Sequence, residues 1–111
     1  MTVGAWLSRR TLRPPEALDA RVRRALGGRL ALDASETHRV CEAAAEEVLS
    51  SLLGARETGR ESALDLLAVD ALVTYAFEHA AAGGDLDAMA VGAMQRIAAI
   101  GAHHAAAGDG A

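Results

Sequence analysis

The chain has 111 residues but no lysine, a single cysteine, two prolines and one residue each of tryptophan, tyrosine and phenylalanine. With Cys41 alone, no disulfide forms within the chain, and such a protein is expected inside the cell, in the cytoplasm. Residues 1–15 lack the order of a secretory signal, because their arginines follow a very short apolar patch. No apolar run reaches the roughly 18–20 residues that a membrane-spanning helix needs.

Alanine, leucine and valine dominate a chain in which 51% of the residues are hydrophobic. Alanine is the strongest helix former and leucine is close behind, while the alternation typical of β-strands is absent. This composition predicts an all-α domain. Contacts between alanines bury little area, and each Å² contributes only about 25 cal/mol, so we expect a thin core. Oligomerisation is a usual remedy for a small core.

Prolines, glycine pairs and capping residues divide most of the chain into four helical segments. Pro14-Pro15 precedes the first, Asp33 or Ser35 caps the second, the capping box Thr58-Gly-Arg-Glu61 opens the third, and Asp85 caps the fourth. The predicted helices cover about residues 15–26, 33–53, 58–83 and 85–108. Short connections between the last three favour antiparallel neighbours. We therefore predict a small up-down helical bundle of three long helices, plus a short N-terminal helix and a basic arm.

The run from Glu61 to Phe77 is apolar on almost every side, interrupted after Leu64 only by Asp65, Asp70 and Thr74. A helix that is apolar all round must be covered all round, so this helix is predicted to be the most buried element. On that basis Leu67 and Leu72 both belong to the core, and another chain supplies part of the covering.

Asp70 is the candidate buried polar residue of this run. A buried carboxylate needs a partner, and an arginine from elsewhere in the chain is one possibility. The alternative is a narrow strip of Asp70, Thr74 and Glu78 that faces solvent, because these residues are four apart. A catalytic acid is disfavoured, since no nucleophile or base accompanies it.

Charge is distributed unevenly between the two parts of the chain. Residues 1–29 carry seven arginines and two acids, whereas the remainder carries four arginines and thirteen acids. The predicted organisation is a basic arm over residues 1–14, a bundle over 15–108 and a frayed tail over 109–111. The arm is predicted to dock onto a protein partner through five residues, namely Trp6, Leu7, Arg9, Arg10 and Arg13.

Other roles for the arm remain open at this stage. Its arginines would equally neutralise the acidic body, either its own or that of a neighbouring copy. Contact with a membrane surface through Trp6 is possible but weak, because only one turn is apolar. The acidic body argues against a nucleic-acid surface, so no nucleic acid is expected as a partner.

An antiparallel arrangement brings His38, Cys41 and His79 to one end of the bundle, where they are candidate zinc or iron ligands. The CxxC, HExxH and paired ExxH motifs of established metal sites are missing from the sequence. The alternative is that Cys41 packs in the core while the histidines lie at a hydrated bundle end.

No cofactor motif and no converging set of catalytic residues is evident, so an enzyme is not expected. The sequence favours a non-enzymatic helical interaction or scaffold module, either an oligomerising bundle or a small subunit of a larger assembly. The expected partner is therefore a protein, as a homo-oligomer or in a larger assembly. The alternative is a small ligand- or metal-binding helical bundle.

Overall fold

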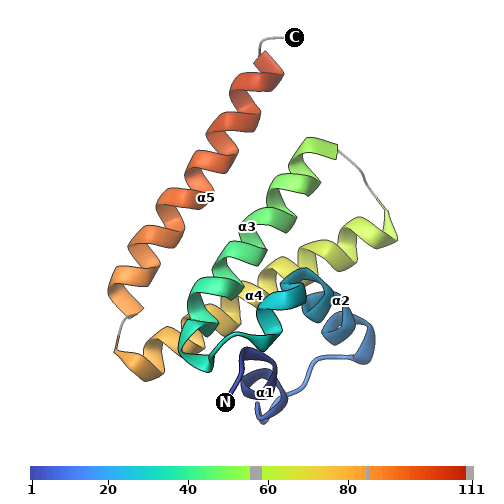
Figure 1. Ribbon diagram of the computed structural model, residues 1–111. Helices are drawn as coiled ribbons and strands as arrows, with labels where there is room; N and C mark the ends of the chain where they lie inside the picture. The colour runs from blue at the N-terminus through green and yellow to red at the C-terminus, as the bar shows by residue number, and fades with distance from the viewer. Residues whose placement is uncertain (56–58, 85, 110–111) are drawn as a thin grey trace.

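The structure, a computed structural model, describes residues 1–55, 59–84 and 86–109 (Figure 1). Within these residues the chain is almost entirely helical and forms no strand, apart from one isolated bridge between Thr2 and Asp33. Five α-helices are present in the described ranges: α1 (Val3–Ser8), α2 (Glu16–Leu26), α3 (Thr37–Ala55), α4 (Arg60–Gly83) and α5 (Leu86–Asp109). Two short 3-10 helices, η1 (Gly27–Ala31) and η2 (Ala34–Glu36), connect α2 to α3. The all-α prediction is confirmed.

Glycines end two of the helices with a positive φ, a conformation that glycine adopts without a steric penalty. Gly27 follows α2 with φ 54°, and Gly84 follows α4 in the left-handed region with φ 82°. The sequence predicted both helix ends, at Gly27-Gly28 and at Gly83-Gly84. Gly59 is the N-cap of α4. Thr58 of the predicted capping box and Asp85, the predicted cap of the last helix, lie outside the described residues.

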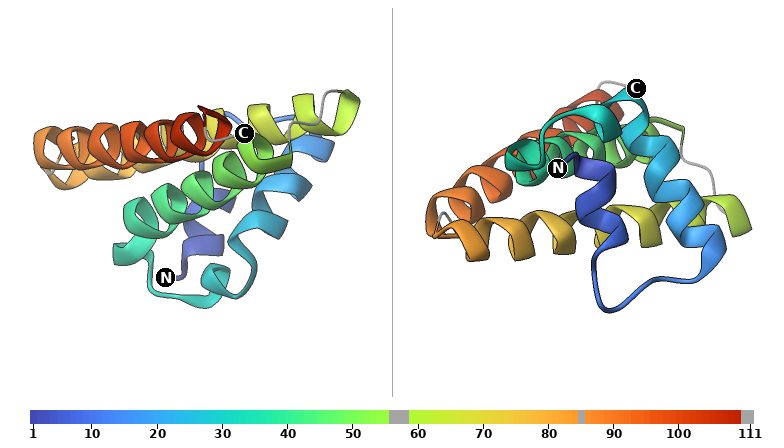
Figure 2. Two further views of the ribbon diagram at one scale, coloured as in Figure 1. Left: turned by 90° about the horizontal axis from the view of Figure 1, so that it is seen from above. Right: turned by 60° about the horizontal axis from the view of Figure 1, so that its bottom comes forward.

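The long helices are not packed equally against one another. α3 lies along α4 in the most extensive helix–helix contact of the fold, and α2 packs on α4 from another side (Figures 1 and 2). α5 contacts both α3 and α4 much less, because α4 and α5 diverge from their connection at Gly84 like the arms of a V (Figure 1). Part of α5 is therefore left without a covering neighbour.

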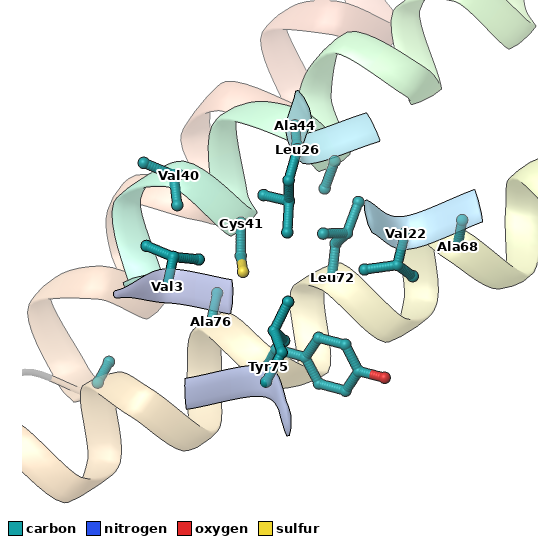
Figure 3. Close-up of a cluster of buried hydrophobic side chains, with 13 residues drawn as sticks. Val3, Val22, Leu26, Val40, Cys41, Ala44, Ala68, Leu72, Tyr75 and Ala76 are labelled. Atoms are coloured by element: carbon teal, nitrogen blue, oxygen red, sulfur yellow. The ribbon is translucent and has the colours of Figure 1, made fainter. Parts of the chain in front are cut away.

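The core lies where α1, α2, α3 and α4 meet (Figure 3). Leu72 of α4 and Val22 of α2 are fully buried there, and the thiol of Cys41 points into the same cluster (Figure 3). Alanines at the α3–α4 contact, Ala44, Ala68 and Ala76, are also buried and let the two helices approach closely. The core is thus built largely of small side chains, as the composition suggested.

The N-terminal segment is part of this core, which corrects the prediction of a separate arm. Val3 is 0% and Leu7 6% exposed, and both belong to the central cluster. The Val3 amide donates to the Leu32 carbonyl at 2.8 Å, and the Ala34 amide donates to the Met1 carbonyl at 2.8 Å. Pro14-Pro15 marks a loop between α1 and α2 and not a domain boundary. The single apolar turn was too short a signal to predict burial from sequence.

The outer face of α4 is not covered by this chain, and cover by another chain stays a prediction. Leu66 and Leu67 are more than half exposed, and Asp70 and Thr74 are exposed with them. The Thr74 hydroxyl donates to the Asp70 carbonyl at 2.9 Å. Asp70 therefore belongs to a surface strip and not to the core. Leu67 was misplaced because it lies three residues before Asp70 and so shares its face of the helix.

Candidate functional site

Two imidazole rings from distant parts of the sequence meet at one end of α3 and α4. His38 lies in the first turn of α3 and His79 in the last turns of α4, and their Nδ1 atoms are 2.8 Å apart. The rings are stacked, with centroids 5.0 Å apart and planes 22° from parallel. Trp6 of α1 contacts the His79 ring edge-on, with 5.6 Å between centroids. We refer to His38 and His79 as the histidine pair.

A hydrogen bond between the two rings sets a condition on their protons. A bond between two ring nitrogens requires that one carries a hydrogen and the other does not. Which of the two Nδ1 atoms donates depends on the tautomers of the rings. Burial lowers the pKa of His79 from its usual 6.5, the charge of His38 lowers it further, and the backbone carbonyl of Ala34 opposes both effects.

The geometry of the pair does not match a metal centre, which corrects the metal-site hypothesis for His38, Cys41 and His79. Two nitrogens on one tetrahedral zinc, each about 2.0–2.1 Å from the metal, lie roughly 3.3 Å apart, farther than the 2.8 Å found here. Cys41 is 0% exposed and belongs to the hydrophobic core cluster, as the alternative interpretation had it. Among the described residues, no three His, Cys, Asp or Glu side chains gather closely enough to hold a metal ion.

Arg10 holds the segment after α1 against α4. Its Nε and one terminal nitrogen donate to the two oxygens of Glu78 at 2.8 and 2.7 Å, while its other terminal nitrogen donates to the Leu12 carbonyl. The guanidinium carbon lies 4.1 Å from the Tyr75 ring centroid, and the Glu78 carboxylate raises the pKa of Arg10. Arg10 is thus engaged within the chain.

The remaining members of the predicted docking set are divided between core and surface. Leu7 is buried, and Trp6 packs against Tyr75 and His79. Arg13 donates to the Ser8 carbonyl at 2.7 Å, whereas the side chain of Arg9 is exposed. Their grouping into a docking arm was wrong, because Trp6 and Leu7 face inward and Arg10 is already paired.

Other N-terminal arginines pair with acids of α3 and α4 in the same way. Arg21 donates to Asp65 at 2.5 Å, and Arg29 donates to both carboxylate oxygens of Glu47. These pairs agree with the alternative interpretation of the charge asymmetry, in which basic residues neutralise the acidic body of their own chain.

The outer face of α5 is exposed and mostly apolar, with Gln95 as its one polar side chain. Met94 is 70% and Val91 59% exposed, and Ala98 and Ala102 are exposed on the same side. At 100° per residue, residues 91, 95, 98 and 102 lie within about 60° of one another on the helical wheel, opposite the buried Ala93. We call these four positions together with Met94 the outer face of α5.

No charged residue falls on this outer face. Between residues 88 and 102 the sequence has a single charge, Arg96, and its guanidinium is turned toward α3, where it pairs with Glu42 and Glu46. Burial raises the pKa of Glu46, and the charge of Glu47 adds to this effect. Sequence reasoning missed this face. The signal that would have found it is the near absence of charge over fifteen residues of a helix that has few neighbours.

Two hollows in the described residues are candidates for a ligand site. One is polar, has a volume of about 240 Å³, and lies among Arg10, Arg13, Asp19 and Tyr75. The other is a crevice between α3, α4 and α5. It is apolar, with Leu49, Val69, Val73 and Ile97 among its lining residues, and its volume is about 20 Å³. That volume accommodates about one water-sized probe, which is far below the several hundred Å³ of typical ligand pockets.

Comparison with protein-family models, with curated proteins and with solved structures yields no match for this chain. None of the helices in the described ranges combines the length and the apolar character that crossing a membrane requires.

Proposed function

We propose that this chain is a non-enzymatic helical interaction module that associates with a second copy of itself through the outer face of α5. The observation that carries the proposal is the strong exposure of Met94 and Val91 on a face without charge. Exposed apolar patches of this kind mark protein–protein contacts more often than isolated surface leucines do. A cytoplasmic location and an up-down arrangement of α3, α4 and α5 are parts of the same proposal.

The order of large and small residues along α5 supports a symmetric partner. Val91 and Met94 lie in the first part of the outer face, whereas Ala98 and Ala102 follow in the second part. In an antiparallel pair of α5 helices, the large residues of one copy lie opposite the small residues of the other. Such a two-fold contact is self-complementary in shape, and it also places opposite ends of the helix dipoles side by side.

Charge supports the same pairing. The chain carries a net charge of −4, so two copies repel each other at long range. The outer face of α5 allows them to meet where no like charges are brought together, because Arg96 is held by acids of its own chain. A strongly charged partner would find no complementary group on this face.

The test is the oligomeric state of the purified chain over a range of concentrations, measured by size exclusion with light scattering. We expect a dimer, and we expect Met94→Glu to give a monomer with unchanged helicity, because two buried glutamates would face the partner helix. Leu12→Glu is the matched control: Leu12 is 79% exposed but lies outside α5, so this variant should remain dimeric.

A parent chain that is monomeric at every concentration, or a Met94→Glu variant that remains dimeric, would contradict the proposal. A parent monomer that binds a different protein through α5 would indicate a subunit of a larger assembly instead. Neither the apolar crevice, which is too small, nor the histidine pair, which is already hydrogen-bonded, supports the ligand-binding alternative. The polar hollow beside Arg10 is the place where that alternative would apply.

A further inference from the structure

The histidine pair connects α3 to α4 directly and lies against Trp6 of α1. His38 also follows η2 (Ala34–Glu36) closely along the chain. Residues next to Ala34 hold the start of α1, through the Val3–Leu32 and Ala34–Met1 backbone bonds. A change in the charge of the pair therefore acts where α1 is attached to the rest of the molecule.

The hydrogen bond within the pair cannot survive when both rings are positively charged. In the neutral pair one Nδ1 carries a hydrogen and the other accepts it. When both imidazoles are protonated, every ring nitrogen carries a hydrogen and neither Nδ1 can accept. The bond is then lost, and two positively charged rings face each other with nitrogens 2.8 Å apart. The rings have to separate, which disturbs the edge contact between His79 and Trp6.

We propose that the histidine pair is a pH-sensitive latch, which holds α1 on the α3–α4 end at neutral pH and loosens it when both imidazoles are protonated. Val3 and Leu7 remain in the core, so the loosening is local to Trp6 and the η2 region. The inference does not depend on the proposed self-association, which uses a different face.

On the elements around the pair, most charged side chains are already bound to a partner. Arg10 binds Glu78, Asp33 accepts from Ser35, Glu36 pairs with Arg39, and Glu42 pairs with Arg96. The other groups are the terminal amine of Met1, whose charge acts on Asp33, the buried Cys41 and Tyr75, and the exposed Asp87 at the start of α5. Burial raises the pKa of both Cys41 and Tyr75, so neither loses its proton near neutral pH.

The sign of the pH dependence follows from the lowered pKa of His79. A histidine that is harder to protonate in the folded state stabilises the fold fully above its ordinary pKa of about 6.5. That stability is lost as the pH falls through the lower pKa of the folded state. The latch therefore opens on acidification and closes again when the pH is raised.

Trp6 is the single tryptophan, so its fluorescence reports the latch directly. With the full chain between pH 8 and 4.5, we expect a reversible change in emission with a midpoint below 6.5, while the far-ultraviolet circular dichroism is retained. His79→Gln should abolish the change. His38→Gln should move the midpoint upward, because it removes the charge that lowers the pKa of His79.

The matched control replaces the two histidines outside the pair, His103 and His104, by glutamine, and should titrate like the parent. The proposal is overturned by a flat emission profile in the parent, by a change that persists in His79→Gln, or by a loss of helix signal at the same midpoint. If His79→Gln does not fold, the direction of the His38→Gln shift decides: a midpoint that stays or falls overturns the latch. An effect of EDTA on the parent profile would indicate a bound metal and would also overturn it.

Discussion

The two leucines Leu67 and Leu72 lie five residues apart on α4, and their surroundings give them opposite roles. Leu72 is 0% exposed in the cluster with Val22 and Cys41, whereas Leu67 is 54% exposed beside Asp70. Truncating a buried leucine removes its transfer free energy and leaves a cavity. Truncating an exposed one does neither, so position on the helix decides the effect and residue type does not.

We predict that Leu72→Ala lowers the free energy of unfolding by about 2–5 kcal/mol, while Leu67→Ala changes it by no more than about 0.5 kcal/mol. Urea denaturation followed by circular dichroism measures both. Because both variants remove the same side chain from the same helix, each serves as the control for the other. Equal effects in the two variants would show that the outer face of α4 is covered, for example by another chain.

The helix α1 contributes to the core although it has only six residues. Val3 and Leu7 are four apart and therefore lie on one face of the helix, and both are buried. Fully burying such side chains contributes about 1.5–3 kcal/mol each, which together is a large share of the roughly 5–15 kcal/mol that stabilises a small domain.

A chain that begins at Pro15 is therefore predicted to unfold at a temperature at least about 10 °C lower than the parent, or to lose cooperative unfolding. Calorimetry or a thermal melt measures this. Arg9→Gln changes the exposed surface of the same segment and serves as the control that should melt like the parent. A truncated chain with an unchanged melting temperature would contradict this prediction and support an arm that is independent of the core.

The helices were largely predictable from sequence, because glycines at 27 and 84 and the 3.6-residue periodicity of α3 are local signals. Local signals do not tell which apolar face meets a partner. Leu67 and Leu72 are the same residue type in one apolar run, but Leu67 shares the face of Asp70, whereas Leu72 lies in the cluster that α2 and α3 form on α4. The histidine pair could be anticipated as a grouping at one end of the bundle, but the hydrogen bond within it depends on packing that no pattern encodes.

Over the whole molecule, the arginines of the N-terminal quarter hold the acidic helices. Arg10 pairs with Glu78, Arg21 with Asp65 and Arg29 with Glu47, so three ion pairs join the segment from residues 10 to 29 to α3 and α4. Partly exposed pairs contribute about 0.2–1 kcal/mol each and are weakened by salt.

Raising sodium chloride from 0.01 M to 1 M shortens the Debye length from about 30 Å to about 3 Å, and we predict a loss of stability of about 1 kcal/mol from these pairs. Urea denaturation at each salt concentration measures it. The variant with Arg21 and Arg29 both replaced by glutamine should show a smaller dependence on salt. If the free energy of unfolding depends equally on salt in the parent and the variant, these ion pairs contribute nothing to stability.

The attachment of α1 also has a consequence for the order in which the chain folds. Arg10 and Glu78 are separated by 68 residues, and Trp6 contacts Tyr75 and His79, which also lie far along the chain. The surface that binds α1 therefore does not exist until α4 has been synthesised. Contacts between distant residues slow folding, whereas the α3–α4 hairpin is local and forms early. Because α1 precedes α4 in the chain, it is synthesised before the surface that buries it, and until then its apolar turn is exposed to chaperones and proteases.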